Sequence, residues 1–101
     1  TLPLELMVKR QTHDTARIYG LHDRGLLQPG QLADINIIDF DQLALPPPTV
    51  AFDLPAGGRR LVQSARGYVA TMKSGQMIMQ GGQRTGALPG RLIRGPQRAP
   101  A

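Results

Sequence analysis

Two histidines that each precede an aspartate are the side chains best suited to chemistry in this chain of 101 residues: His13-Asp14 and His22-Asp23. Imidazole nitrogens and carboxylate oxygens are common ligands of zinc and iron. The two histidines are nine positions apart, however, and neither pair has the spacing of an H-x-H or H-E-x-x-H motif. The pattern therefore predicts no metal site, and we expect both histidines on a surface helix or turn.

Nucleophilic catalysis has no clear candidate either. The chain has no cysteine, and its two serines are Ser64 and Ser74. Neither serine has the glycine-framed surroundings of a nucleophile elbow, and Ser74 stands in a predicted turn. The glycine pairs at 57–58 and 81–82 lack a following helix with a lysine or hydroxyl in place, so they predict no phosphate-binding loop. The residues alone thus predict no catalytic, cofactor-binding or metal-binding side chain.

The elements that would have to position such side chains begin with helices. Apolar residues recur at helical spacing over residues 3–11, and Glu5 stands where the positive end of a helix dipole favours an acid. Thr12 is suited to cap a second helix, and Gly20 is suited to end it. The sequence therefore predicts two short helices before residue 20.

Strand signals follow. Residues 33–40 are rich in isoleucine and bounded by acids, which predicts a strand. Pro46-Pro47-Pro48 predicts a stiff extended connector, or else a ligand for an aromatic-lined groove. Residues 68–73 and 76–80 are β-rich runs separated by Ser74-Gly75, which predicts a tight hairpin. Beyond the hairpin, the arginine-rich end is expected to be extended.

The chain carries a formal charge of +5, from ten arginines and two lysines against seven acids. Clustered arginines can bind phosphates, and the excess gathers at Arg84, Arg91, Arg94 and Arg98. Six aspartates are interleaved through the first half of the chain, and four aromatic residues provide no stacking platform. We therefore do not expect nucleic acid as a partner. A free-standing basic module for another anionic partner stays open as an alternative.

Length and composition allow one domain at most, because a chain this short buries only about 60% of its unfolded surface. Without cysteine there is no disulfide framework that would indicate an oxidising compartment. No apolar run approaches the ~20 residues that a membrane span needs, and residues 1–5 lack the pattern of a signal peptide. We therefore expect a cytoplasmic protein with no membrane partner. The missing initiator Met suits an excised fragment.

Two stretches resemble a known family. The first, residues 25–39, is a glycine turn that feeds a branched apolar strand ending on an acid, and the second is residues 81–94, GGQRTGALPGRLIR. Together they resemble the C-terminal end of the metal-dependent amidohydrolases. The Gly30-x-x-Ala33-Asp34 pattern, with Asp39 closing the strand, resembles many members of that superfamily.

Two narrower stretches, residues 52–60 and 85–91, resemble the branch of the N-acyl-D-amino-acid deacylases, or D-aminoacylases. The family has a catalytic (β/α)8 barrel and a smaller β-domain built from strands at both chain ends. The resemblance implies that residues 1–24 are the last barrel helices, residues 25–94 the C-terminal share of the β-domain, and residues 95–101 a flexible tail. The implied fold is mainly β with N-terminal helices, an α+β share of a β-sandwich or barrel without a complete (β/α)8 barrel.

The resemblance also implies zinc or another divalent metal in the parent enzyme. The family's ligands are histidines on barrel strands, including an H-x-H, with a bridging Cys or carboxylated Lys, and a late barrel Asp is the general base toward metal-bound water. None of these motif positions occurs here, so no catalytic or metal-binding residue is carried over. We expect a noncatalytic structural segment of an enzyme that hydrolyses amide bonds of N-acyl-D-amino acids. Its expected partners are the barrel and the N-terminal strands, and self-association of the fragment is a further expectation.

Overall fold

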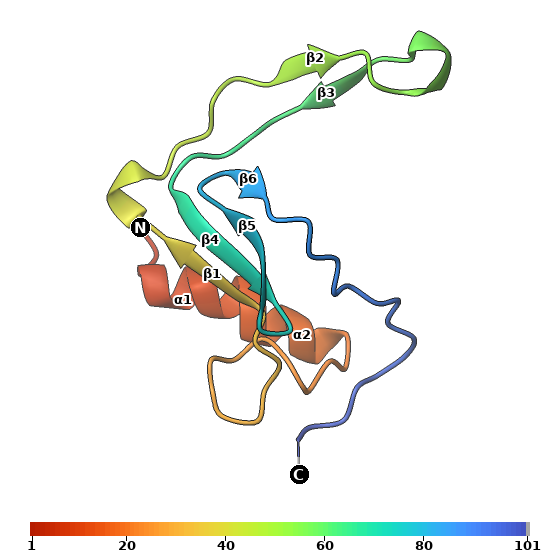
Figure 1. Ribbon diagram of the computed structural model, residues 1–101. Helices are drawn as coiled ribbons and strands as arrows, with labels where there is room; N and C mark the ends of the chain where they lie inside the picture. Colours follow the sequence, from red (N-terminus) through yellow and green to blue (C-terminus); the bar gives the residue numbers. More distant parts are fainter. Residues whose placement is uncertain (101) are drawn as a thin grey trace.

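A helix lies across one face of a four-stranded antiparallel sheet, and a two-stranded arm leaves the sheet region (Figure 1). This architecture comes from a computed structural model, which describes residues 1–100. The element order is mainly β after the N-terminal helix, and no closed barrel forms among the described residues. The predicted α+β fold class without a complete barrel is therefore confirmed.

The N-terminal helix is nearly continuous, as α1 (Leu4–Lys9), a π-helical turn (Arg10–Asp14) and α2 (Thr15–Ile18) follow one another. The prediction of a separate second helix capped by Thr12 is wrong. The backbone there stays helical, and the Thr12 hydroxyl donates to the Val8 carbonyl at 2.7 Å, one turn earlier. Gly20 follows the helix with φ +72°, as predicted. No helix in the described part of the chain is long and apolar enough to cross a bilayer.

The sheet has the order β1-β4-β5-β6, with β1 at Ile35–Ile38, β4 at Tyr68–Lys73, β5 at Gln76–Gln80 and β6 at Gln83–Arg84. The predicted hairpin of β4 and β5 is confirmed in its bounds and its turn. The strand predicted over residues 33–40 is shorter than expected, because a 3-10 turn (Phe40–Gln42) replaces its end. The sequence did not predict β6.

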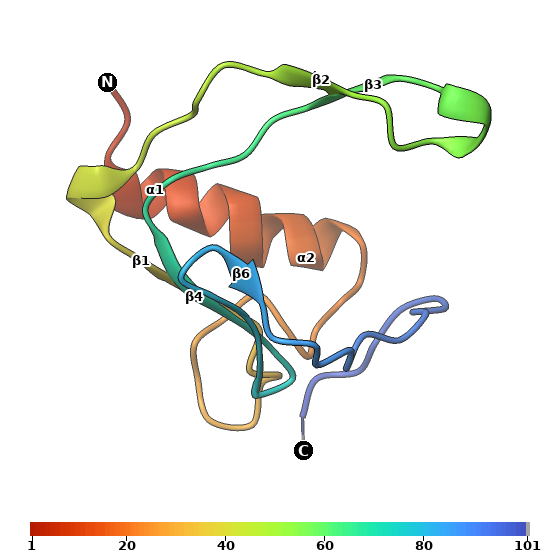
Figure 2. The ribbon, with the colours of Figure 1, turned by 45° about the horizontal axis from the view of Figure 1, so that its top comes forward.

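The arm is the feature that the sequence missed most clearly. It pairs β2 (Thr49–Ala51) with β3 (Arg60–Val62), carries a 3-10 turn (Pro55–Gly57) at its tip, and starts at the bridge between Ala44 and Arg66. We call residues 44–66 the arm. Figures 1 and 2 show it extending away from the sheet and helix. Among the described elements, β2 and β3 contact only each other.

The hydrophobic core is very small. Only Ala16 and Ala70 are buried hydrophobic residues in the described chain, and twenty-two large hydrophobic side chains are exposed. The accessible surface is 8423 Å², whereas a self-contained globular protein of 10.9 kDa exposes about 5600 Å². The radius of gyration is 16.2 Å, against about 13 Å for a compact domain of this length. The chain therefore leaves much of its apolar surface uncovered.

Candidate functional site

The two histidines lie on different elements. His13 lies in the π-helical turn, where its Nδ1 is 3.5 Å from Asp14 Oδ1, and His22 lies in the turn after the helix. Residues 1–100 contain no group of three His, Cys, Asp or Glu side chains placed to hold a metal ion. The donor set of this chain therefore does not fit the metal that the family resemblance implies. That none of its residues is catalytic or metal-binding stays a prediction.

Several carboxylates are held by cations. Arg24 donates to both oxygens of Asp23, at 2.9 and 3.2 Å, and both side chains are largely covered. This hydrogen bonding lowers the pKa of Asp23. The Lys9 ammonium lowers the pKa of Asp14 in the same way. A general base works best with a pKa near the operating pH, and these shifts go in the opposite direction. The carboxylates therefore act as structural partners of cations.

Asp34, from the Gly30-x-x-Ala33-Asp34 pattern, has a structural role in the hairpin. Its Oδ1 accepts a hydrogen bond from the backbone N–H of Ser74 at 2.9 Å and another from Lys73 Nζ at 3.2 Å. The Gly75 N–H donates to the carbonyl of Ala33 at 3.0 Å. This pattern therefore holds the tip of the β4–β5 hairpin against the start of β1.

An open apolar groove runs beside the first helix. Its volume is about 590 Å³, and its apolar lining includes Leu4, Val8, Leu26 and Leu27. Gly25 lets the loop close onto the helix, because a Cβ there would lie 3.0 Å from the Ala16 Cβ and from the Thr12 carbonyl oxygen. We call this surface the helix groove. It is a candidate contact surface for a larger body.

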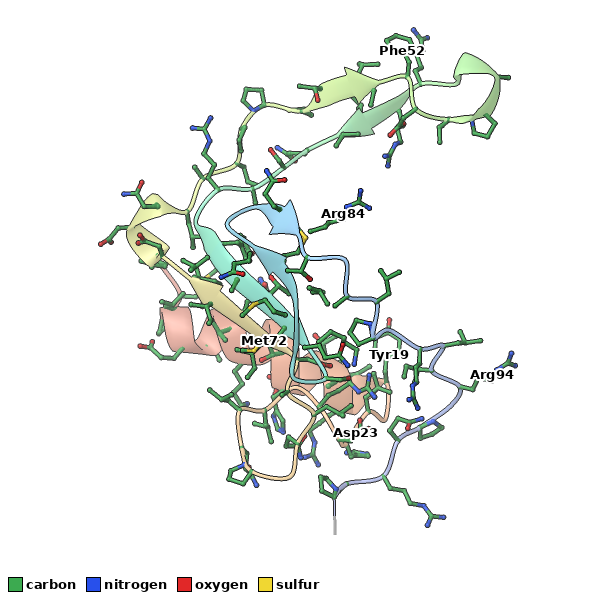
Figure 3. The ribbon with its side chains drawn as sticks, in the orientation of Figure 1. Tyr19, Asp23, Phe52, Met72, Arg84 and Arg94 are labelled. Carbon is green, nitrogen blue, oxygen red and sulfur yellow. The ribbon has the colours of Figure 1, made fainter. Side chains whose placement is uncertain are left out.

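The arm presents a second apolar surface. Val50 lies opposite Leu61 in the β2–β3 pairing, so their side chains share one face, and alternation places Phe52 there too. These three side chains are 53%, 72% and 70% exposed. Figure 3 shows Phe52 at the outer part of the arm, away from the sheet. The opposite face carries the ion pair of Arg60 with Asp53, whose pKa Arg60 lowers by hydrogen bonding.

This arm face was difficult to predict from the sequence. Its apolar residues are separated by Pro55 and by glycines, which favour a loop. The alternation of Val50 and Phe52 was the available signal, but it spans too few residues to predict a strand.

The C-terminal arginines stay apart from the ion pairs. Figure 3 shows Arg84 and Arg94 projecting outward from different parts of the chain. None of the ion pairs found within residues 1–100 involves Arg84, Arg91, Arg94 or Arg98. The final segment still packs, since Gln97 exchanges backbone hydrogen bonds with Gly20 and His22 at 2.9 and 3.0 Å. The division into residues 1–24, 25–94 and 95–101 stays a prediction.

Comparisons with known proteins show sequence similarity over most of the chain. Residues 1–79 match the sequence model of the amidohydrolase family. Two similar proteins come from strains DSM 10664 / DCB-2 and Y51 of Desulfitobacterium hafniense, and both are named 5-methylthioadenosine/S-adenosylhomocysteine deaminase. Each is 42% identical over 81 residues, which cover 78% of this chain and only 17% of the relative. No solved structure matches the chain.

Proposed function

Because the chain belongs to the amidohydrolase family, we propose that it is the noncatalytic C-terminal structural segment of a longer metal-dependent hydrolase. The observation that carries this proposal is the uncovered apolar surface: within residues 1–100 only two alanines are buried, and twenty-two large hydrophobic side chains are exposed. A segment that completes a domain of a longer enzyme would bury such apolar surface against the rest of that enzyme. The matched region, which makes up 17% of each relative, is consistent with that larger body.

The catalytic metal, zinc or another divalent ion, would then be held by other residues of the longer enzyme. The donors in residues 1–100 do not converge on a metal site. The work of this chain would be to close the small β-domain and to support the catalytic barrel. Its expected contacts are that barrel and strands from the N-terminal part of the enzyme.

For the substrate, we propose the amide bond of an N-acyl-D-amino acid. The support is the resemblance of residues 52–60 and 85–91 to the D-aminoacylase branch. The second of these stretches lies beyond the region matched by the family model, residues 1–79. A second candidate is deamination of a nucleoside, because the two relatives at 42% identity are named deaminases.

Assays of the longer enzyme distinguish the two substrates. Purified enzyme is given N-acetyl-D-amino acids, their L enantiomers and 5-methylthioadenosine, with and without a metal chelator. The proposal expects release of free amino acid from the D substrates, with loss of activity in the chelator. Release of ammonia from 5-methylthioadenosine alone would instead assign the deaminase function.

Metal analysis of this chain tests its noncatalytic role. The two histidines lack the spacing of a metal motif and the chain has no cysteine, so we expect no stoichiometric transition metal and no hydrolase activity in residues 1–101 alone. The measurement is elemental analysis after dialysis against zinc, with the double variant His13→Ala and His22→Ala as control. One tightly bound zinc per chain that the double variant loses would contradict the proposal.

A further inference from the structure

We propose that the arm is a docking element whose apolar face binds the part of the same polypeptide that precedes residue 1. This inference rests on the proposed function, because it requires a longer enzyme. It adds the surface through which this chain is held, namely the face of Val50, Phe52 and Leu61.

No other described element of the chain packs against the strands of the arm. The two strands are three residues each. An isolated two-stranded hairpin is marginally stable in water, and it normally needs a third strand or a packed face. An arm that keeps a defined shape in the enzyme therefore needs a surface on which to pack.

The base of the arm holds it away from the sheet. Ala44 and Arg66 exchange two backbone hydrogen bonds, at 2.8 and 3.3 Å, and Gln63 Nε2 donates to the Pro46 carbonyl at 3.1 Å. Pro46-Pro47-Pro48 then forms a stiff connector into β2. The arm thus extends outward, and its apolar face is not covered by the rest of this chain.

The two faces of the arm differ in chemistry, and this difference indicates which face binds the partner. On one face Asp53 and Arg60 neutralise each other. On the other face Val50, Phe52 and Leu61 are more than half exposed. Burial of such apolar area is the main favourable term in association. The partner surface is therefore apolar.

Two observations favour the preceding polypeptide over a second copy of this chain. Each copy carries a formal charge of +5, so the net charge opposes a tight pairing of two copies. In Figure 1 the N-terminus lies over the Phe40–Gln42 turn, and in Figure 2 it lies beyond that turn, on the side of the molecule along which the arm extends. A preceding polypeptide would therefore enter on the side from which the arm extends. The preceding polypeptide would be large enough to cover the arm, since the matched region is only 17% of each relative.

Photo-crosslinking in the purified longer enzyme tests the inference. The photoreactive residue p-benzoylphenylalanine replaces Phe52 or Leu61, and the matched control replaces Thr49, which pairs with Val62 on the opposite face of the arm. We expect crosslinks from positions 52 and 61 to peptides that precede residue 1, and their loss at position 49. Crosslinks that join two polypeptides would overturn the inference in favour of a second copy, and no crosslink from either position would show that the face is free.

Hydrogen exchange gives a second measurement. In the longer enzyme, changing Phe52→Ser and Leu61→Ser should accelerate amide exchange in β2 and β3 about tenfold or more, whereas Thr49→Ser should not. Equal exchange in all variants would overturn the docking. Hydrolase activity of the unmodified enzyme reports separately on the proposed function. An active enzyme without arm crosslinks keeps that function and removes only the docking.

Discussion

The Asp34 carboxylate accepts hydrogen bonds from Ser74 and Lys73, which follow it by 40 and 39 residues. An acid at this position therefore ties β1 to the turn of the next hairpin. The same applies to Asp53, which Arg60 holds on the arm. At the scale of single residues, Asp34 and Asp53 thus connect segments that are apart in the sequence.

The Asp23–Arg24 pair makes a prediction about pH. Hydrogen bonding from Arg24 lowers the pKa of Asp23 in the folded protein, so the pair stabilises the fold above the ordinary aspartate pKa of ~4. That stabilisation is lost as the pH falls through the lowered pKa. We expect the Asp23 carboxyl to titrate below its ordinary range by NMR, and its midpoint to rise in Arg24→Gln. An identical midpoint in both proteins would mean that the pair does not form in solution.

At the scale of elements, the β4–β5 hairpin was predictable and the arm was not. The hairpin has two β-rich runs around Ser74-Gly75, and both turn residues have positive φ, 51° and 77°. These signals are local. The arm depends on pairing between short segments separated by a proline-rich and glycine-rich stretch, which resembles a loop when the sequence is considered alone. The contact between Asp34 and Ser74 could not be predicted either, because no local sequence rule links residues 40 positions apart.

The hairpin turn can be tested at Gly75. Its φ of +77° lies in the left-handed region, where a β-branched side chain is strained. Gly75→Val should therefore cost at least ~1 kcal/mol in the free energy of unfolding, measured by urea denaturation of the longer enzyme. Gly90→Val is the matched control, since Gly90 is outside the positive-φ region and has open space around it. An equal effect of the two substitutions would remove the strained turn from the fold.

The base of the arm can be tested at Gly67. Gly67 and Gly57 both have positive φ, at +95° and +71°, so alanine is strained at either position. Only at Gly67 would the new Cβ also meet backbone atoms of Leu43, at 2.8 Å. We therefore expect Gly67→Ala to destabilise the longer enzyme by ~1 kcal/mol or more beyond the cost of Gly57→Ala. Equal melting temperatures for the two variants would show that this close approach does not exist in solution.

At the scale of the whole molecule, the resemblance of the sequence to one end of a larger enzyme predicted that the chain is a segment of a longer protein. The structure is consistent with this prediction, because large apolar surfaces are exposed. The helix groove and the arm both leave apolar side chains in water. Leu4, Met7, Val8 and Ile37, on the helix and β1, are 43% to 53% exposed, whereas Ile35 is partly covered. Sequence patterns identified apolar faces, but the absence of a covering layer only becomes visible once the elements are placed in space.

This uncovered surface leads to a prediction for residues 1–101 expressed alone. The chain exposes 8423 Å², against the ~5600 Å² typical of its mass, so we expect it to self-associate weakly or to unfold at low temperature. If the proposed function holds, adding the rest of the enzyme should stabilise the segment by mass action, because a partner that binds only the folded form shifts the equilibrium toward it. Sedimentation and thermal unfolding over a series of protein concentrations measure both effects. A cooperative monomer whose melting temperature is independent of concentration would mean that these residues form a self-sufficient domain, and it would favour a free-standing basic module whose unpaired arginines bind an anionic partner.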